Sequence, residues 1–247
     1  MKSFLAAVSF LSIIPSGKDE KYSAGQMKDS MGYYPFVGVI LGICYSAIYL
    51  LSAVLFSHLA ACALVLGSMV ILTGGLHLDG VADTCDGLAG GRDKENILRI
   101  AKDSATGVAG VLGLIVIMLI KFSLLVSLAP EVVPYALVLS TTLARWSLVA
   151  ACRLYPYARS KEGTARVFVG RIKNKQMVRA TLVAIIVSLF ICKFQAVTVW
   201  PWLLLFFWGF NSYIVKKIDG ITGDTLGALS EFSEVLVLLL AAGFLYD

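Results

Sequence analysis

The sequence has 247 residues, of which 58% are hydrophobic and only 15% are charged, and its formal net charge is +5. Soluble domains are about 45–50% apolar and about 25% charged, so the composition excludes an ordinary soluble enzyme, a disordered chain and a small disulfide scaffold. It predicts an all-α fold: a polytopic membrane bundle of about six to seven transmembrane helices with a short N-terminal interfacial or re-entrant helix.

The first apolar run, Phe4–Ile14, follows Lys2 and has the layout of a secretory signal. Its exit, Ile14-Pro15-Ser16-Gly17, is a poor cleavage site. The run is also too short to cross a bilayer, since a spanning helix needs about 20 apolar residues. The pattern therefore favours an interfacial or re-entrant helix over a signal peptide.

Longer apolar stretches follow, and the prolines lie at or near their ends, where a missing N–H matters least. The expected spans are Phe36–Phe56, Leu59–Leu76, Gly107–Ala129, Pro134–Ala151, Ala180–Val199, Trp202–Val215 and Leu226–Tyr246. The sixth is short, so it is either tilted or merged with its neighbour. No internal repeat or low-complexity tract interrupts the chain, and residues 1–247 are predicted to form a single membrane-embedded domain.

The charges sort to one side of the predicted bundle. Tight hairpins at Ser57–His58, Pro130–Val133 and Trp200–Pro201 would place all the longer connections on the opposite face. Those connections are Ser16–Tyr34, His77–Thr106, Cys152–Arg179 and Lys216–Thr225. They hold seventeen of the twenty-one Lys and Arg residues, so the positive-inside rule predicts that this face is cytoplasmic. The excess of Lys and Arg has two explanations. It orients the protein in the membrane and contacts anionic lipid headgroups, or some of these cations hold a phosphorylated substrate. Neither explanation requires a nucleic-acid partner.

An acidic motif follows the second span. Asp79, Asp83 and Asp86 are spaced i, i+4 and i+7, so on a helix they share one face within roughly 60°. Carboxylates this close repel one another unless cations lie between them. Oxygen ligands of this kind suit Mg²⁺ or Mn²⁺ and not zinc. The motif is therefore predicted to hold a metal, with a solvated acidic loop as the alternative.

The neighbours of the acidic motif suit phosphate chemistry. Glycines such as Gly75 let the backbone approach a bulky ligand, and Arg92 and Lys102 supply cations of the kind that clamp phosphate groups. His77 has three equivalent interpretations: a ligand, a general base or an interfacial histidine.

The last span carries acids of its own. Asp224, Glu231 and Glu234 fall on one helical face if the helix begins near Asp224, and they could point toward the first cluster. Acids inside a membrane are functional candidates by default. Arg145, alone in its span, is a natural counter-charge, so a purely structural Glu–Arg pair is the alternative.

Over its full length the chain resembles the cobalamin synthase family, the adenosylcobinamide-GDP ribazoletransferases that close the nucleotide loop of vitamin B12. The most specific match is Gly74–Gly87, GGLHLDGVADTCDG. The other matching segments are Phe4–Pro15, Tyr34–Gly38, Lys102–Gly107, Arg145-Trp146, Pro156–Arg159 and Gly220–Ala228. One small departure is Ala105-Thr106, where an Arg-Ile-like pair is expected.

The resemblance implies a specific reaction in the cytoplasmic (inner) membrane, with the active site facing the cytoplasm. A ribose hydroxyl of α-ribazole, or of its 5′-phosphate, attacks the cobinamide-side phosphorus of adenosylcobinamide-GDP, and GMP leaves. The lipid bilayer is the implied environment. A homo-oligomer, or a complex with other enzymes of nucleotide-loop assembly, stays open.

The resemblance also implies roles for residues of this chain. Mg²⁺ would be held by Asp79, Asp83 and Asp86, with Asp103 or Asp224 completing the shell. The implied substrate-binding residues are Arg92, Lys102, Arg145, Arg159 and Gly75. Asp83 and Asp86 would act directly in catalysis, and the candidates for the general base are Asp224, Glu231 and His77.

Two other functions remain in view. The segment Asp83–Arg92 is similar to the DxxDGxxAR signature of CDP-alcohol phosphotransferases, which would make the chain a phospholipid headgroup transferase. It carries one extra residue before Arg92, and the second half of that signature is not matched. A divalent-cation transporter would also explain the acids, but the repeats typical of transporters are absent.

Overall fold

The computed structural model describes residues 1–15, 22–159 and 163–244, and this part of the chain is helical without a β-strand. The prediction of an all-α fold is confirmed. The α-helices are α1 (Lys2–Leu11), α2 (Ala24–Ser30), α3 (Tyr34–Leu55), α4 (His58–Thr73), α5 (Leu76–Gly90), α6 (Lys94–Ile100), α7 (Val108–Ser127), α8 (Val133–Leu154), α9 (Asn174–Cys192), α10 (Ala196–Ile218) and α11 (Gly223–Phe244). Short 3₁₀ turns are η1 (Met31–Tyr33), η2 (Thr164–Val167) and η3 (Lys193–Gln195).

Five described segments are long and apolar enough to cross a membrane, so the chain is an integral membrane protein. They are Ala24–Leu55, Val108–Ser127, Val133–Leu154, Asn174–Ile218 and Gly223–Gly243. A sixth is added if α4 and α5, which meet at an angle of 88°, count as one broken span. Helix α1 has 10 residues and cannot span, in agreement with the expected short N-terminal helix.

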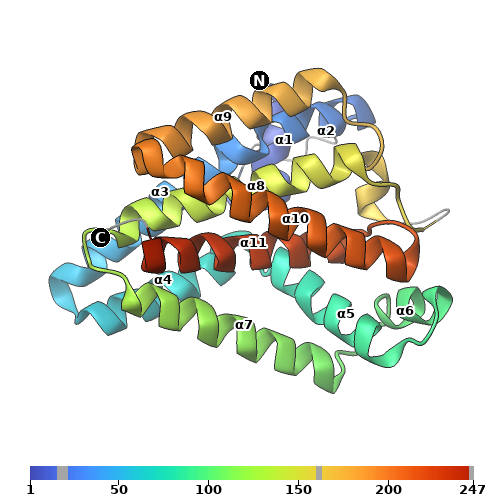
Figure 1. Cartoon of the computed structure of the whole chain (residues 1–247), viewed down its shortest axis with the longest axis horizontal. Helices are drawn as coiled ribbons and strands as arrows, with labels where there is room; N and C mark the ends of the chain where they lie inside the picture. The colour runs from blue at the N-terminus through green and yellow to red at the C-terminus, as the bar shows by residue number, and fades with distance from the viewer. Residues whose placement is uncertain (16–21, 160–162, 245–247) are drawn as a thin grey trace.

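Helix α8 lies at the centre of the bundle, with α3, α9 and α11 around it (Figure 1). Its backbone lies directly against that of α3, with only glycine between them. A Cβ added at Gly38 would lie 2.6 Å from the Thr141 carbonyl oxygen, and one added at Gly42 would lie 2.5 Å from Val138 Cα. Small residues four apart let membrane helices approach in this way. The Thr141 hydroxyl donates to the Gly38 carbonyl at 2.8 Å, which adds an interhelical hydrogen bond.

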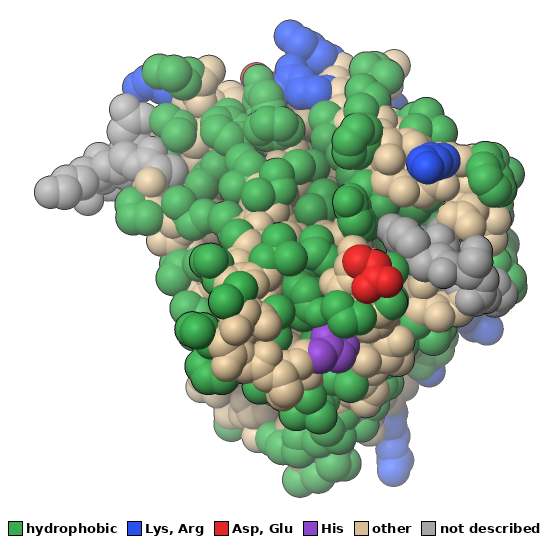
Figure 2. Space-filling model, turned by 90° about the vertical axis from the view of Figure 1, so that its left-hand side faces the viewer, with side chains coloured by type: hydrophobic (Ala, Val, Ile, Leu, Met, Phe, Trp, Pro, Cys, Tyr) green, Lys and Arg blue, Asp and Glu red, His purple; other side chains and the backbone are tan. Residues whose placement is uncertain are grey.

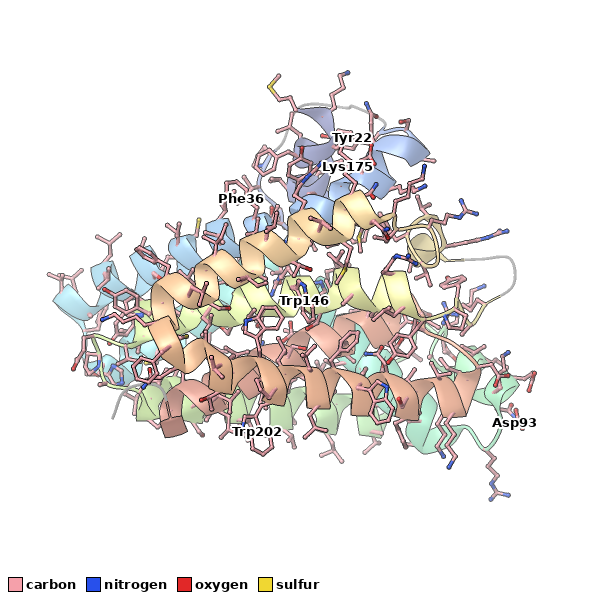
Figure 3. The ribbon with its side chains drawn as sticks, turned by 45° about the horizontal axis from the view of Figure 1, so that its top comes forward. Tyr22, Phe36, Asp93, Trp146, Lys175 and Trp202 are labelled. Atoms are coloured by element: carbon pink, nitrogen blue, oxygen red, sulfur yellow. The ribbon has the colours of Figure 1, made fainter. Side chains whose placement is uncertain are left out.

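The predicted hairpin at Trp200–Pro201 is wrong. The chain reverses at η3, and α9 and α10 run in opposite directions in Figure 1 and Figure 3, with Pro201 inside α10. Lys193 takes a positive φ of 51° at the reversal. A lysine inside the bilayer is unfavourable, so the turn forms at the Lys193–Gln195 segment. The span expected to be short, Trp202–Val215, is part of the 23-residue helix α10.

The two ends of the bundle differ in their connections. The links from α3 to α4, from α7 to α8 and from α9 to α10 lie at the left-hand end of Figure 1, whereas α5, α6 and the start of α11 lie at the right-hand end. The left-hand face is covered mostly by hydrophobic side chains and shows few charges (Figure 2). Asp93, in the link between α5 and α6, marks the opposite end in Figure 3. The predicted connections His77–Thr106 and Lys216–Thr225 therefore lie at the same end, whereas Ser16–Tyr34 and Cys152–Arg179 include residues that lie outside the described ranges.

Candidate active site

Helix α5 begins at a sharp bend after α4. Gly74 and Gly75 both have left-handed backbones, with φ of 60° and 68°, and together they end α4 and begin α5. Glycine is the residue that adopts this conformation without steric strain. The two helices meet at 88°, and α5, with 15 residues, is not one of the five spanning segments.

Helix α5 crosses the start of α11 at very close range. A Cβ added at Gly80 would lie 2.6 Å from the Asp224 carbonyl oxygen and 3.0 Å from Gly227 Cα. Two glycines at the crossing point therefore let the two backbones meet. Because Asp79 and Asp83 flank Gly80, the crossing brings the acids of α5 close to Asp224 in the first turn of α11. The predicted approach of the two acidic segments is present for Asp224.

Asp83 is the most perturbed carboxyl of this group. Burial, and after it the charge of Asp79, raises the pKa of Asp83 to about 6. Asp224 and Asp86 add to the same rise. Asp79 is exposed and Asp83 is half-buried. Burial and three neighbouring carboxylates therefore disfavour the ionised form of Asp83.

Asp224 has a cationic partner in the loop after α8. Arg159 Nη2 donates to Asp224 Oδ2 at 3.0 Å, and the Thr222 hydroxyl donates to the same oxygen at 3.2 Å. Thr222 also caps α11, because its hydroxyl accepts from the Thr225 N–H. The guanidinium of Arg159 is thus held at the edge of the acidic cluster, where it can bind a phosphate oxygen.

A cavity of about 170 Å³ opens beside these acids. Its polar wall is formed by His77, Asp79 and Asp224. His77 is buried, and its Nδ1 has no hydrogen-bond partner. The remaining lining residues are Phe10, Met31, Tyr34, Leu76, Gly80, Leu148, Cys152, Ala165, Phe168, Gly223, Leu226 and Gly227.

A second, larger hollow adjoins the cavity. It has a volume of about 740 Å³ and lies between α1, the bend from α4 to α5, and α7. Phe10, Leu76 and Asp79 line both spaces. Gly75 also lines the larger hollow, and no heavy atom lies within 4 Å of a Cβ added there. Asp79 therefore stands where a large open groove meets a small cavity.

Asp86 faces a different partner. Its two carboxylate oxygens accept hydrogen bonds from the N–H groups of Gly107 and Gly110, both at 2.7 Å. These groups are the unsatisfied donors at the start of α7. A Cβ added at Gly107 would lie 2.5 Å from one carboxylate oxygen of Asp86, and a Cβ added at Gly110 would lie 2.4 Å from the other. Asp86 thus fixes α7 against α5 in this structure.

Within the described ranges, no three His, Cys, Asp or Glu side chains stand close enough to hold a metal by themselves. Mg²⁺ is usually held by one or two carboxylates, several waters and the phosphates of a substrate. Asp79 supplies a hard oxygen donor of that kind next to open space, and the half-buried Asp83 lies close to it. Their chemistry therefore fits Mg²⁺ together with a diphosphate substrate, and it does not form a closed protein cage.

The other acids of α11 belong to a buried ion cluster. Lys121 Nζ lies 2.5 Å from both Glu231 Oε2 and Glu234 Oε2, and Arg145 donates to Glu234. All four side chains are nearly inaccessible. The pairing expected between Arg145 and an acid of the last span is confirmed. The structure places Arg145 and Glu231 in this cluster and not in the wall of the cavity.

Three further candidates lie in exposed connections. Arg92 lies between α5 and α6, and Lys102 and Asp103 follow α6. The Asp103 carboxylate accepts from the Ala105 N–H at 3.1 Å, which is a local turn. None of the three lines the cavity or the groove.

Sequence reasoning missed two features of the site. The first is the role of Lys121, which the sequence could have indicated because it is a lone cation in the apolar span of α7. The second is the aromatic lining of the cavity. The sequence could not have indicated it, because Phe10, Tyr34 and Phe168 come from three separate segments, and aromatic residues are common in apolar stretches.

Known proteins resemble the chain over nearly all of its length. Residues 3–242 match the family model of cobalamin-5-phosphate synthases. Relatives named adenosylcobinamide-GDP ribazoletransferase include one from Clostridium novyi, 31% identical over 99% of this chain and 98% of the relative. Another, from Alkaliphilus metalliredigens, is 34% identical over 98% of this chain and 97% of the relative. No solved structure matches. The chain belongs to the cobalamin-5-phosphate synthase family.

Proposed function

We propose that this protein is an adenosylcobinamide-GDP ribazoletransferase. It joins adenosylcobinamide-GDP to α-ribazole or α-ribazole 5′-phosphate, and it gives adenosylcobalamin or its 5′-phosphate with release of GMP. The relatives that it matches over nearly full length carry this name. The structural observation that supports it best is the position of Asp79, at the junction of a small cavity and a large groove, next to Asp83 and Asp224.

The two spaces suit a reaction between two substrates of different size. In the transfer, an acceptor hydroxyl oxygen forms a bond to the cobinamide-side phosphorus. The bond between that phosphorus and the bridging oxygen breaks, and GMP leaves with the oxygen. The hydroxyl proton passes to one of the two candidate bases that line the cavity, Asp224 or His77. Glu231, the third candidate, is occupied by Lys121.

The diphosphate brings negative charge to an acidic site, so cations are required. Asp79 and Asp83 would hold Mg²⁺, which when bound neutralises phosphate oxygens and the developing charge on the leaving group. Arg159 is a protein cation held beside these acids through its contact with Asp224. It can exchange this carboxylate for a phosphate oxygen when a substrate arrives.

The proposed location is the cytoplasmic membrane, with the site on the cytoplasmic side. Support comes from the long connections that gather at one end of the bundle and carry most of the Lys and Arg residues. Both substrates are polar or charged, and the groove opens at the level of the bend between α4 and α5.

Purified protein in liposomes tests the function. It is given adenosylcobinamide-GDP, α-ribazole 5′-phosphate and Mg²⁺, and GMP and the corrinoid product are followed by mass spectrometry. The expected result is GMP and a ribazole-bearing corrinoid in equal amounts, both abolished by EDTA and restored by Mg²⁺. If neither product forms while a known family member works beside it, the proposal fails, and CDP-alcohol substrates and cation flux become the next assays.

A further inference from the structure

The cavity next to Asp79 is lined by three aromatic side chains. The ring centroids of Phe10 and Tyr34 are 6.1 Å apart in a stacked arrangement, and Phe168 meets Phe10 edge-on at 5.3 Å. Three segments supply these rings: α1, the start of α3 and the turn after η2. Tyr34 and Phe168 are almost fully buried, at 2% and 3% exposure. Aromatic walls of this kind bind flat ring systems by stacking or edge contacts.

Three polar side chains also line the cavity. They are His77, Asp79 and Asp224, and the Nδ1 atom of His77 is buried without a partner. A buried polar atom without a partner is unfavourable unless a ligand or water satisfies it nearby. The cavity therefore combines a surface for a flat apolar ring with a surface for hydroxyl groups.

The size of the cavity limits what it can hold. Its volume is about 170 Å³, and an apolar protein cavity of about 150 Å³ holds a molecule of the size of benzene. One flat aromatic ring fits this space and a bicyclic base would extend from it toward the groove, whereas a corrin ring or a complete nucleoside diphosphate does not fit. The adjoining groove of about 740 Å³ has room for the larger substrate.

The geometry points to this cavity as the subsite for the acceptor nucleoside, with its aromatic base against Phe10, Tyr34 and Phe168. The ribose then lies toward Asp79 and Asp224, where the groove and the cavity meet. The donor diphosphate occupies the groove, so the hydroxyl and the phosphorus meet at Asp79. This assignment rests on the proposed function and adds which residues select the acceptor.

The test uses the full-length protein in liposomes with Phe168→Ala. Base stacking on an aromatic side chain is worth enough that its loss weakens binding roughly tenfold or more. The KM for α-ribazole should therefore rise about tenfold, while the KM for adenosylcobinamide-GDP stays the same. Phe207→Ala is the matched control, because Phe207 is equally buried, at 4% exposure, and lies outside the cavity. It should leave both KM values unchanged.

A second variant keeps the test decisive if Phe168→Ala does not fold. Phe168→Leu keeps an apolar side chain of similar bulk but removes the flat face, so it should raise the same KM when Phe168→Ala cannot be purified. An unchanged acceptor KM in the folded variant, or a rise confined to the donor KM, overturns the assignment.

Direct binding separates this inference from the proposed function. Equilibrium binding of radiolabelled α-ribazole to the purified wild type should be weakened by Phe168→Leu and not by Phe207→Ala. If the wild type binds the nucleoside in this way but forms no product, the proposed function fails and the cavity assignment stands. If product forms and neither binding nor KM depends on Phe168, the assignment alone fails.

Discussion

Asp83 carries the largest electrostatic penalty among the acids of α5. Half-buried and close to Asp79, it would be easier to ionise with a cation beside it. Arg159, whose charge lowers the pKa of Asp83, is already engaged with Asp224. At the scale of single residues, the site is therefore arranged to attract positive charge from a ligand.

Asp83→Asn removes that attraction without changing the size of the side chain. We expect kcat to fall by about a hundredfold or more, since metal contacts to phosphoryl oxygens are worth several kcal/mol and 1.4 kcal/mol is about tenfold in rate. Insertion and the melting temperature should change little. Glu131→Gln, an exposed acid at the other end of the bundle, is the control. Near-normal turnover by Asp83→Asn would remove the metal hypothesis.

The buried ion cluster calls for a different prediction. Glu234→Leu leaves Arg145 buried without its partner, and breaking such a pair costs about 3–5 kcal/mol. The double variant with Arg145→Leu should recover much of that loss, because Lys121 still pairs with Glu231. Thermal unfolding in detergent measures both. Activity per folded molecule should persist, since none of the four residues lines the cavity, and its loss would assign the cluster to catalysis.

At the scale of elements, the site depends on how closely α5 and α11 cross. Gly80 and Gly227 let these two helices meet. Asp86 of α5 caps the first turn of α7, which fixes α7 to α5. Helices α7 and α11 are also joined farther along by Lys121 and the acids Glu231 and Glu234. The positions of Asp79, Asp83 and Asp224 thus follow from helix packing and not from loops.

Gly80→Ala tests the crossing. Its Cβ would lie 2.6 Å from a backbone oxygen that cannot move aside easily, so we expect about 1–3 kcal/mol of destabilisation and a marked loss of activity. Gly209→Ala on α10 is the matched control, because no heavy atom lies within 4 Å of the added Cβ. That variant should be unchanged or more stable by up to about 1 kcal/mol. Equal melting temperatures for the two variants would contradict the close crossing.

At the scale of the whole molecule, the bundle is polarised along its length. Short links and an apolar surface occupy one end, and the acidic site occupies the other. Of the twenty-one Lys and Arg residues, seventeen belong to the four connections predicted to lie at that second end. An integral membrane protein with this distribution should orient with its basic end in the cytoplasm.

Cysteine labelling measures that orientation. Arg99→Cys, in α6, and Glu131→Cys, between α7 and α8, place exposed thiols at the two ends. In intact cells, an impermeant maleimide should label position 131 and leave position 99 unlabelled. Inverted vesicles should give the reverse. The opposite pattern would place the site on the outer side of the membrane.

The sequence allowed prediction of most of the fold, since long apolar runs and terminal prolines mark the spans well. It failed at Trp200–Pro201 because a Trp-Pro pair looks like a membrane boundary, while the true turn at Lys193–Gln195 is short and flanked by apolar residues. Periodicity placed Asp79, Asp83 and Asp86 on one helix, which is confirmed. It could not show that Asp86 faces α7, because that contact depends on how two helices pack.

The buried ion cluster also has a consequence for the biogenesis of the protein. Lys121 precedes Glu231 by 110 residues, and Arg145 precedes Glu234 by 89. Both cations are therefore synthesised and inserted long before the acids that neutralise them, and a lone charge in a bilayer is unfavourable.

We expect α7 and α8 to be held by the insertion machinery or by each other until α11 arrives. A chain truncated before Gly223 should be degraded rapidly in cells, and the same truncation with Lys121→Leu and Arg145→Leu should persist longer in a pulse–chase experiment. Helix α11 then acts as the completion signal for assembly, because its two glutamates make the bundle electrically neutral inside the membrane.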